Sequence, residues 1–384
     1  MRFEFATATR ILFGAGTFGE AASAAKEMGQ RAFLLTGGSR ERHRHFADLL
    51  QSNGVVATPF AVGQEPGITL VQQGIELARH AGCNLVIALG GGSAIDAGKA
   101  VAALLTNEGN LIDYLEVIGG GRSLALPAAP FIAIPTTAGT GSEVTRNAVL
   151  ASPEHRVKAS MRSPLMLPRL AIVDPELTYD LPPAITASTG LDALTQVIEP
   201  YVSVRANSMT DVFCLEGMCR AARSLLRAFR DGRSTSARAD MAFASLMGGL
   251  ALANAGLGVV HGFAAPIGGM FPAPHGAVCA ALLGPGMAAN IRALRSRAPE
   301  SEFLARYQKV AAVLTGNSGA APEEGPEFVR SLCAVLAIPP LRSYGIREGD
   351  VAMLVAHASR ANSMKGNPVA LAPQELAAVL MQAL

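Results

Sequence analysis

Five short and almost entirely apolar runs in the first half of the chain constrain its fold more than any other feature. Segments of helical length separate them, and the runs are Ala32–Leu35, Val55–Phe60, Leu85–Leu89, Phe131–Ile134 and Ala171–Asp174. A strand that is apolar on both sides belongs to a sheet covered on both faces, and helical crossovers make such a sheet parallel. The pattern therefore predicts an α/β domain built on a mostly parallel sheet.

The pattern changes after Pro182 and Pro183. Long segments rich in Ala, Leu and Met replace the strand-like runs, and their composition favours helix. The main ones are residues 191–202, 208–229, 237–253 and 302–314. A proline pair continues neither a helix nor a central strand. We therefore predict an α/β domain over residues 1–181 and an all-helical domain over residues 182–384, with the functional site in the cleft between them.

Composition excludes several classes of function. Half of the 384 residues are apolar, 16% are charged and the formal net charge is +2, which is typical of a globular protein and speaks against a nucleic-acid partner. The five cysteines form no Cys-x-x-Cys pair and no signal peptide is apparent, so we expect a cytoplasmic protein. Residues 241–291 contain no Asp, Glu, Lys or Arg. Because this stretch holds four prolines and has arginines beyond both ends, we predict a buried interior around a polar site and no membrane span.

A glycine-rich turn follows the run Leu85–Leu89. It reads Gly90-Gly91-Gly92-Ser93, and a helix is expected to begin at about Ala94. Glycines let the backbone approach a phosphate closely, and the N–H groups at a helix start point toward an anion. We predict that this turn holds phosphate, with a plain strand-to-helix turn as the alternative. Asp96 is expected either to face a cofactor ribose or to form a surface ion pair with Lys99.

A second polar loop, residues 135–143, follows the run Phe131–Ile134. It carries hydroxyl side chains and two glycines, which offer donors for phosphate and ribose oxygens. Such loops are common without a function. The prediction becomes stronger if both loops lie at the same edge of one sheet.

These motifs, in this order, resemble those of a known family. Five segments carry the resemblance, namely Gly90–Lys99, Ile134–Glu143, Asp174-Pro175, Gly190–Gln196 and the pair His261-Gly262 with Pro274-His275-Gly276. They are similar to the motifs of the iron-containing (group III) alcohol dehydrogenases, within the dehydroquinate-synthase-like superfamily. The resemblance implies a nucleotide-binding α/β domain followed by a helical metal and substrate domain.

The resemblance also implies roles for single residues. Gly91, Gly92 and Ser93 would hold the pyrophosphate of NAD or NADP. The cofactor would also contact Thr136, Thr137, Thr140 and Ser142, and Lys158 would reach its ribose. Asp192, His261 and His275 match three of the four ligands of a divalent metal, with Fe²⁺ expected first and Zn²⁺ or Mn²⁺ as alternatives.

Two positions depart from the family pattern. Gln196 stands where the family has its fourth metal ligand, a histidine, and it lies four residues after Asp192 on one face of the expected helix. An amide oxygen can coordinate a metal, but it is a weaker donor than imidazole toward a first-row metal. Ala265 stands where many members have a histidine that assists proton movement. We predict Gln196 as the fourth ligand and a proton path that does not use position 265.

The turn after the run Ala32–Leu35 suggests which nicotinamide cofactor binds. It reads Thr36-Gly37-Gly38-Ser39-Arg40 and lacks the acidic residue that would accept from the ribose hydroxyls in NAD-preferring relatives. We therefore place Gly37 and Ser39 in the cofactor site and expect NADP to be accepted. The alternative is an ordinary turn with Arg40 in solvent.

The main prediction is hydride transfer between NAD(P)H and a small alcohol, aldehyde or ketone, in a homodimer or larger homo-oligomer. Three alternatives stay open. The first is reduction of an oxo acid, as in maleylacetate reductases, with Arg146 or Arg162 binding carboxylates. The second is a dehydroquinate-synthase-like lyase, against which the charge-free stretch counts. The third is a non-catalytic nucleotide-binding relative, because Gln196 and Ala265 replace histidines.

Overall fold

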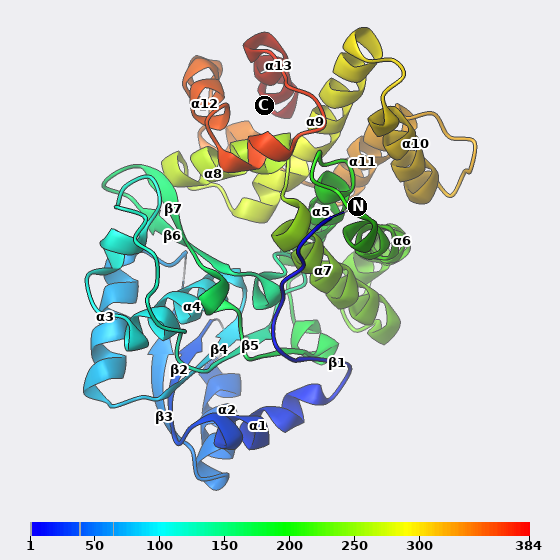
Figure 1. The fold of residues 1–384 in the computed structure, drawn as a ribbon. Coiled ribbons are helices and arrows are strands. Elements are labelled where there is room, and N and C mark those ends of the chain that lie inside the picture. Colours follow the sequence, from blue (N-terminus) through cyan, green and yellow to red (C-terminus); the bar gives the residue numbers. More distant parts are fainter. Residues whose placement is uncertain (1, 38–39, 64) are drawn as a thin grey trace. The chain divides into compact units, whose positions relative to one another are not determined.

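The computed structural model describes residues 2–37, 40–63 and 65–384 (Figure 1). The chain forms two compact units. The α/β unit comprises Ala6–Thr137 and Gly141–Thr178. The helical unit comprises Tyr179–Leu384, Ala138–Thr140 and an N-terminal segment that ends at Phe5. An α/β half followed by a helical half confirms the predicted fold class.

The α/β unit is built on a six-stranded sheet in which every pairing is parallel. The strand order is β1-β8-β5-β4-β2-β3. The strands are β1 (Ile11–Phe13), β2 (Arg31–Thr36), β3 (Val56–Ala61), β4 (Leu85–Gly90), β5 (Phe131–Pro135) and β8 (Leu170–Val173). Each of the five predicted runs forms a strand of this sheet. β2, β4, β5 and β8 are buried on both faces, whereas β3 lies at the edge of the sheet and its residues are exposed or half-buried.

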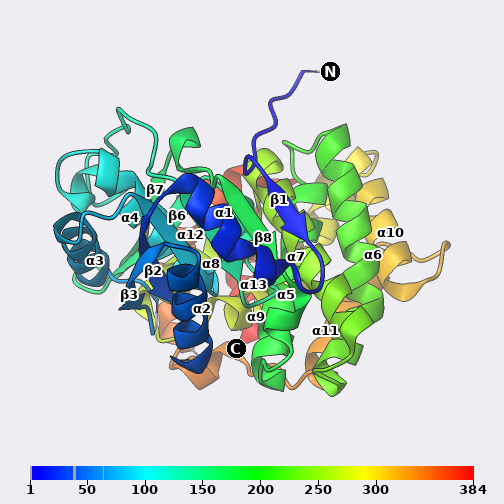
Figure 2. The same ribbon diagram turned by 90° about the horizontal axis from the view of Figure 1, so that it is seen from below.

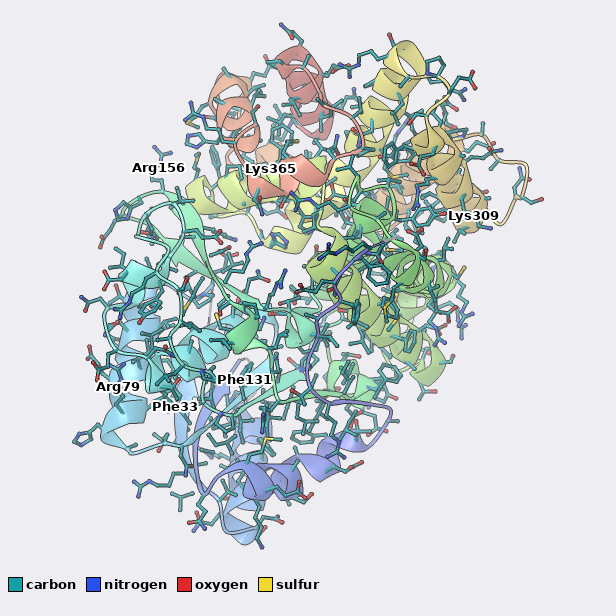
Figure 3. All side chains as sticks on the ribbon, in the orientation of Figure 1. Phe33, Arg79, Phe131, Arg156, Lys309 and Lys365 are labelled. Carbon is teal, nitrogen blue, oxygen red and sulfur yellow. The ribbon has the colours of Figure 1, made fainter. Side chains whose placement is uncertain are left out.

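In the described part of the α/β unit, four α-helices cover the two faces of the sheet, and they are α1 (Ala21–Met28), α2 (Arg40–Ser52), α3 (Ile68–His80) and α4 (Gly92–Thr106). Alternate strand residues divide between two cores. Phe33 and Phe131 pack with α3 and α4, whereas Leu34 and Ile132 pack with α1 and α2. Figure 2 shows α1 and α2 together on their face of the sheet, and Figure 3 labels Phe33 and Phe131. The period-two alternation of strand side chains explains why both faces are apolar.

Sequence reasoning missed three strands. β1 is only three residues long, and β6 (Asn147–Ser152) pairs with β7 (Val157–Arg162) in an antiparallel hairpin outside the main sheet. The hairpin strands alternate between buried and half-buried residues, so they lack the continuous apolar run that identified the others.

The helical unit contains nine α-helices in the described part of the chain. They are α5 (Pro183–Tyr201), α6 (Ser208–Arg230), α7 (Thr235–Ala255), α8 (Val259–Met270), α9 (His275–Arg297), α10 (Glu302–Thr315), α11 (Glu324–Val335), α12 (Val351–Ala358) and α13 (Pro373–Ala383). The proline pair begins α5 instead of only preceding it, because Pro183 occupies the first helical position, where a missing N–H costs nothing.

The centre of the helical unit is α5, which packs against α6, α7 and α9. Glycines bring these helices close together. A Cβ at Gly190 would lie 2.2 Å from a methyl of Leu225, and a Cβ at Gly217 would lie 2.7 Å from Val197. α5 is therefore buried along most of its length, and polar side chains on it face protein instead of water.

Among the described residues, one helix by itself is long and apolar enough to cross a membrane, and α7 and α8, which are bent by 98° relative to each other, pass the same test only as a pair. The single helix is α9, whose most apolar window has a mean hydropathy of 1.4. However, 78% of that window is buried inside the structure, as in the core helix of a globular unit. The charge-free stretch of the sequence thus forms buried helices around polar side chains, as predicted.

Candidate active site

The glycine-rich turn lies at the carboxyl edge of the sheet, next to the point where the order in which the chain adds strands reverses. From β2 the chain continues to β3 on one side, whereas β4 pairs with β2 on the other side. In parallel α/β sheets, nucleotides bind beyond the carboxyl ends of the strands at such a point of reversal. The turn after β2 and the turn after β4 both border this point in the α/β unit.

Backbone packing requires glycine in this turn. A Cβ at Gly90 would lie 2.7 Å from the Cβ of Ala94 and 3.0 Å from the backbone nitrogen of Gly37. The helix α4 begins at Gly92, two residues earlier than expected, so Gly92 and Ser93 occupy its first turn. The N–H groups of a first turn lack intrahelical acceptors and attract anions. The residues present therefore fit the pyrophosphate of a dinucleotide.

The hydroxyl-rich loop lies at the same edge of the sheet. Gly90 is in register with Pro135, and the backbone N–H of Thr136 donates to Gly90 O at 3.0 Å. The Thr137 side chain lies beside Gly91. This confirms that the two loops are neighbours, although their contacts with a cofactor stay predictions.

Asp96 and Ser142 belong to a buried polar network. The amine of Lys99 is fully buried and donates to Ser142 Oγ at 2.7 Å, to Thr145 Oγ1 at 2.8 Å and to Asn147 O at 2.8 Å. Asp96 accepts from Ser142 Oγ and, at 3.0 Å, from the backbone N–H of Val149. The interpretation of Asp96 and Lys99 as a surface pair is wrong, because Lys99 lies inside the core. Their bonds tie α4 to the loop after β5.

Glu143 is buried in the same loop. It is 2% exposed, and burial raises its pKa to about 7, while Lys99 nearby opposes the shift. Its place in a polar motif gave no sign of this burial, because a loop of hydroxyl residues is expected to face water.

Three other predicted cofactor residues have different surroundings. Lys158 pairs with Glu65, and its reach to a ribose stays a prediction. Thr140 belongs to the helical unit, next to Gly139. Gly37 donates its backbone N–H to Leu89 O at 3.1 Å. Ser39 lies outside the described residues.

A cluster of four side chains in the helical unit fits a metal ion. Asp192 comes from α5, His261 from α8, and His275 and Cys279 from α9. One ligand atom from each lies within 4.8 Å of the others. Asp192 Oδ1 lies 3.5 Å from His261 Nε2 and 3.7 Å from His275 Nε2. These separations suit atoms that share one cation.

An unpaired oxygen supports the fit. Asp192 Oδ1 is fully buried and accepts no hydrogen bond from the described residues. Burial by itself raises the pKa of Asp192, but the opposing effect of His275 and His261 is larger. The pKa of Asp192 is therefore lowered and the carboxylate stays charged. A buried charge without a donor is costly unless a cation or proton balances it. The donor set therefore fits a divalent metal held by Asp192, His261 and His275, the three predicted ligands.

His261 is oriented by a residue that sequence reasoning missed. Glu199 Oε2 accepts from His261 Nδ1 at 2.7 Å, and Glu199 Oε1 accepts from the backbone N–H of Val260 at 2.7 Å. An ionised carboxylate only accepts, so the ring carries its proton on Nδ1 and turns Nε2 toward Asp192. Glu199 lies two helical turns after Asp192 on α5, and this i, i+7 spacing was the available signal.

Electrostatics in the cluster favours a positive charge. Burial lowers the pKa of His261, but Cys279, Asp192 and Glu199 raise it well above its usual range. Burial raises the pKa of the Cys279 thiol to about 12, against the opposing effect of His261. The acidic groups around His261 therefore favour a positive charge at the centre of the cluster.

The two departures from the family pattern have clear positions. Gln196 is buried on α5 and its Nε2 donates to Gly139 O at 2.8 Å. Ala265 lies on α8, one turn after His261, with an exposed side chain. Coordination by Gln196 stays a prediction.

Comparison with known proteins identifies the class. The pattern of the family described as "Iron-containing alcohol dehydrogenase" matches residues 8–175, and that of the "Fe-containing alcohol dehydrogenase family, C-terminal" matches residues 186–384. The chain belongs to the iron-containing alcohol dehydrogenase family. It is accordingly an oxidoreductase that transfers hydride between a nicotinamide dinucleotide and an alcohol or its carbonyl product.

Individual relatives agree with this membership. A 1,3-propanediol dehydrogenase of Klebsiella pneumoniae is 35% identical over 92% of this chain and 92% of its own length. An NAD-dependent methanol dehydrogenase of Bacillus methanolicus is 32% identical over 97% of each chain. The crystal structure of a 1,3-propanediol oxidoreductase superposes with a TM-score of 0.91 at 32% identity, covering 100% of both chains.

Proposed function

We propose that this enzyme interconverts small primary alcohols and their aldehydes with NADPH or NADH, using a divalent metal held by Asp192, His261 and His275. The observation that carries the proposal is the buried Asp192 oxygen, which accepts no hydrogen bond from the described residues and lies 3.5 and 3.7 Å from two imidazole nitrogens. Further support comes from relatives named for 1,3-propanediol and methanol.

The protein's own groups prepare the site in definite ways. Glu199 holds the imidazole of His261 in the tautomer that offers Nε2, and Asp192 supplies the negative charge of the site. A divalent metal bound there would act as a Lewis acid toward the substrate oxygen. The nicotinamide supplies or accepts the hydride, and the first turn of α4 would hold its pyrophosphate. With Ala265 one turn after His261, α8 offers no second imidazole for proton transfer at that position.

The experiment compares metal-free and reconstituted enzyme in oxidation of NADH and NADPH with short aldehydes. We expect turnover only after addition of Fe²⁺, Zn²⁺ or Mn²⁺. Asp192→Asn should lower kcat/KM by at least about 100-fold, because a Lewis acid supplies several kcal/mol of transition-state stabilisation. Asp180→Asn is the matched control, since Asp180 forms an exposed ion pair with Arg233 in the same unit. Full turnover without metal would refute the metal-assisted reaction.

The proposal extends to the cofactor and the assembly. We propose that NADPH is used at least as well as NADH, since the corner at Gly37 carries no carboxylate before Arg40. Arg40→Ala should then lower kcat/KM for NADPH and leave that for NADH unchanged. An equal loss with both cofactors would refute this role. The cytoplasmic location, the homodimer and the cleft between the two halves stay predictions, and light scattering of the purified protein tests the dimer.

A further inference from the structure

The metal cluster contains a ligand that the family pattern does not provide. Cys279 Sγ lies 3.6 Å from His275 Nε2 and 3.8 Å from His261 Nε2. It is a buried free thiol, four residues after His275 on α9. Residues four apart on a helix project from the same side, so one turn of α9 presents both an imidazole and a thiol to the cluster.

The distances match those of a tetrahedral site. Zinc bonds of about 2.3 Å to sulfur, 2.0–2.1 Å to nitrogen and 2.0–2.2 Å to oxygen place tetrahedral ligands roughly 3.3–3.6 Å apart. Cys279 Sγ and Asp192 Oδ1 each lie 3.5 to 3.8 Å from the Nε2 atoms of His261 and His275. A contraction of a few tenths of an ångström would therefore bring four protein donors onto one cation.

Gln196 already uses part of its amide elsewhere. Its Nε2 donates to Gly139 O. Of the two ends of the Gln196 amide only the nitrogen can donate to a carbonyl oxygen, so this bond fixes the orientation of the amide group. From the other side, Gly248 on α7 comes so close that a Cβ there would lie 3.0 Å from Gln196 Cβ. The side chain of Gln196 thus forms a hydrogen bond that connects α5 with the segment 138–140 of the helical unit.

We infer that Cys279, and not Gln196, is the fourth protein ligand, giving an Asp/His/His/Cys site that selects Zn²⁺ over Fe²⁺. The inference rests on the metal site of the proposed function. Metal binding would break the S–H bond, release the thiol proton to solvent and form the sulfur–metal bond, with no change of oxidation state. Asp192 and the thiolate then balance both charges of the cation. A soft thiolate adds to the preference for zinc over iron that any nitrogen and oxygen set already shows.

The test replaces the native metal with Co²⁺ and records the absorption spectrum of the full-length protein. We expect a near-ultraviolet thiolate-to-cobalt charge-transfer band in the wild type. The band should disappear in Cys279→Ser and persist in Gln196→Ala. Cys219→Ser is the matched control, because Cys219 is an exposed thiol on α6 and its loss should leave the band unchanged.

Metal affinity gives a second readout. Loss of a partner that only orients a ligand costs about 10–100-fold in affinity, so loss of Cys279 should weaken Zn²⁺ binding by at least about 10-fold. Gln196→Ala should change it by less than about 3-fold. The preference for Zn²⁺ over Fe²⁺ in competition should fall in Cys279→Ser and stay unchanged in Gln196→Ala, because the general order of metal affinities favours zinc in all three proteins and only the thiolate adds to it.

The outcomes distinguish the thiolate ligand from the metal site as a whole. Cobalt that binds without a charge-transfer band, or a band that survives in Cys279→Ser, overturns the thiolate ligand and leaves the proposed function intact. No binding of Co²⁺ or Zn²⁺ to the wild type overturns the metal site itself. If Cys279→Ser fails to fold, X-ray absorption at the zinc edge of the wild type serves instead, and we expect a sulfur atom at about 2.3 Å from the metal. A zinc shell without sulfur overturns the inference.

Discussion

Glu199→Gln tests whether one carboxylate prepares the metal site. In the native protein Glu199 accepts three donors, namely His261 Nδ1 at 2.7 Å, the N–H of Val260 at 2.7 Å and the N–H of His261 at 3.4 Å. A glutamine of the same shape keeps only one acceptor oxygen. Its NH₂ group must then face either the Val260 N–H or the imidazole. The substitution therefore disturbs the tautomer of His261 without removing any metal ligand.

Two magnitudes follow from this geometry. Loss of one hydrogen bond to a charged acceptor should lower the free energy of unfolding by about 1.5–3 kcal/mol. Loss of a group that orients a ligand should weaken metal binding by about 10–100-fold, which corresponds to about 1.4–2.7 kcal/mol. Both effects come from a residue that lies beside the cluster and is not part of it.

The assay is competition for Zn²⁺ against a chelator of known affinity, with urea unfolding of the metal-free protein as the stability readout. Glu323→Gln is the control, because Glu323 is a half-exposed partner of Arg295 in the same unit, and it should change neither quantity appreciably. If Glu199→Gln binds Zn²⁺ as tightly as the wild type, the orienting role of Glu199 is wrong. A loss of stability alone would leave Glu199 as only a cap for the first turn of α8.

Three further predictions concern the α/β unit. Gly98→Ala should lower the free energy of unfolding by about 1–3 kcal/mol in urea titrations, because its Cβ would lie 2.8 Å from the ring of Phe131; unchanged stability would contradict close packing of α4 on the sheet. Lys99→Met should cost about 3 kcal/mol or more in the same assay, since it leaves the Asp96 network without its buried cation, and a neutral outcome would refute the network's role. Because burial raises the pKa of Glu143 from 4.5 to about 7, the folded state binds the proton more tightly, so this residue's contribution to stability is present below about pH 4.5 and declines as pH rises through about 7. Glu143→Gln should therefore gain stability relative to the wild type with rising pH, by at most about 1.4 kcal/mol per pH unit, and a pH-independent difference between the two would contradict the burial argument.

The sequence by itself determined the class of fold. Runs such as Leu85–Leu89 are apolar on both faces, and only a sheet covered on both sides can bury them, so the strands and the helical crossovers could be predicted from local pattern. The same holds for the glycine turn, whose place after a strand and before a helix is a local property. Family motifs identified Asp192, His261 and His275, which the structure brings together.

Only the tertiary structure decided which polar groups meet. Lys99 looked like a surface residue beside Asp96, yet the loop after β5 and the first residue of β6 cover its amine and supply its three acceptors. Glu199 and Cys279 looked like ordinary helix residues, and their roles arise because α5, α8 and α9 converge at one point. Spacing along a helix defines a shared face, but it does not define what that face meets. That depends on packing between segments far apart in the chain, which no local pattern in a single sequence records.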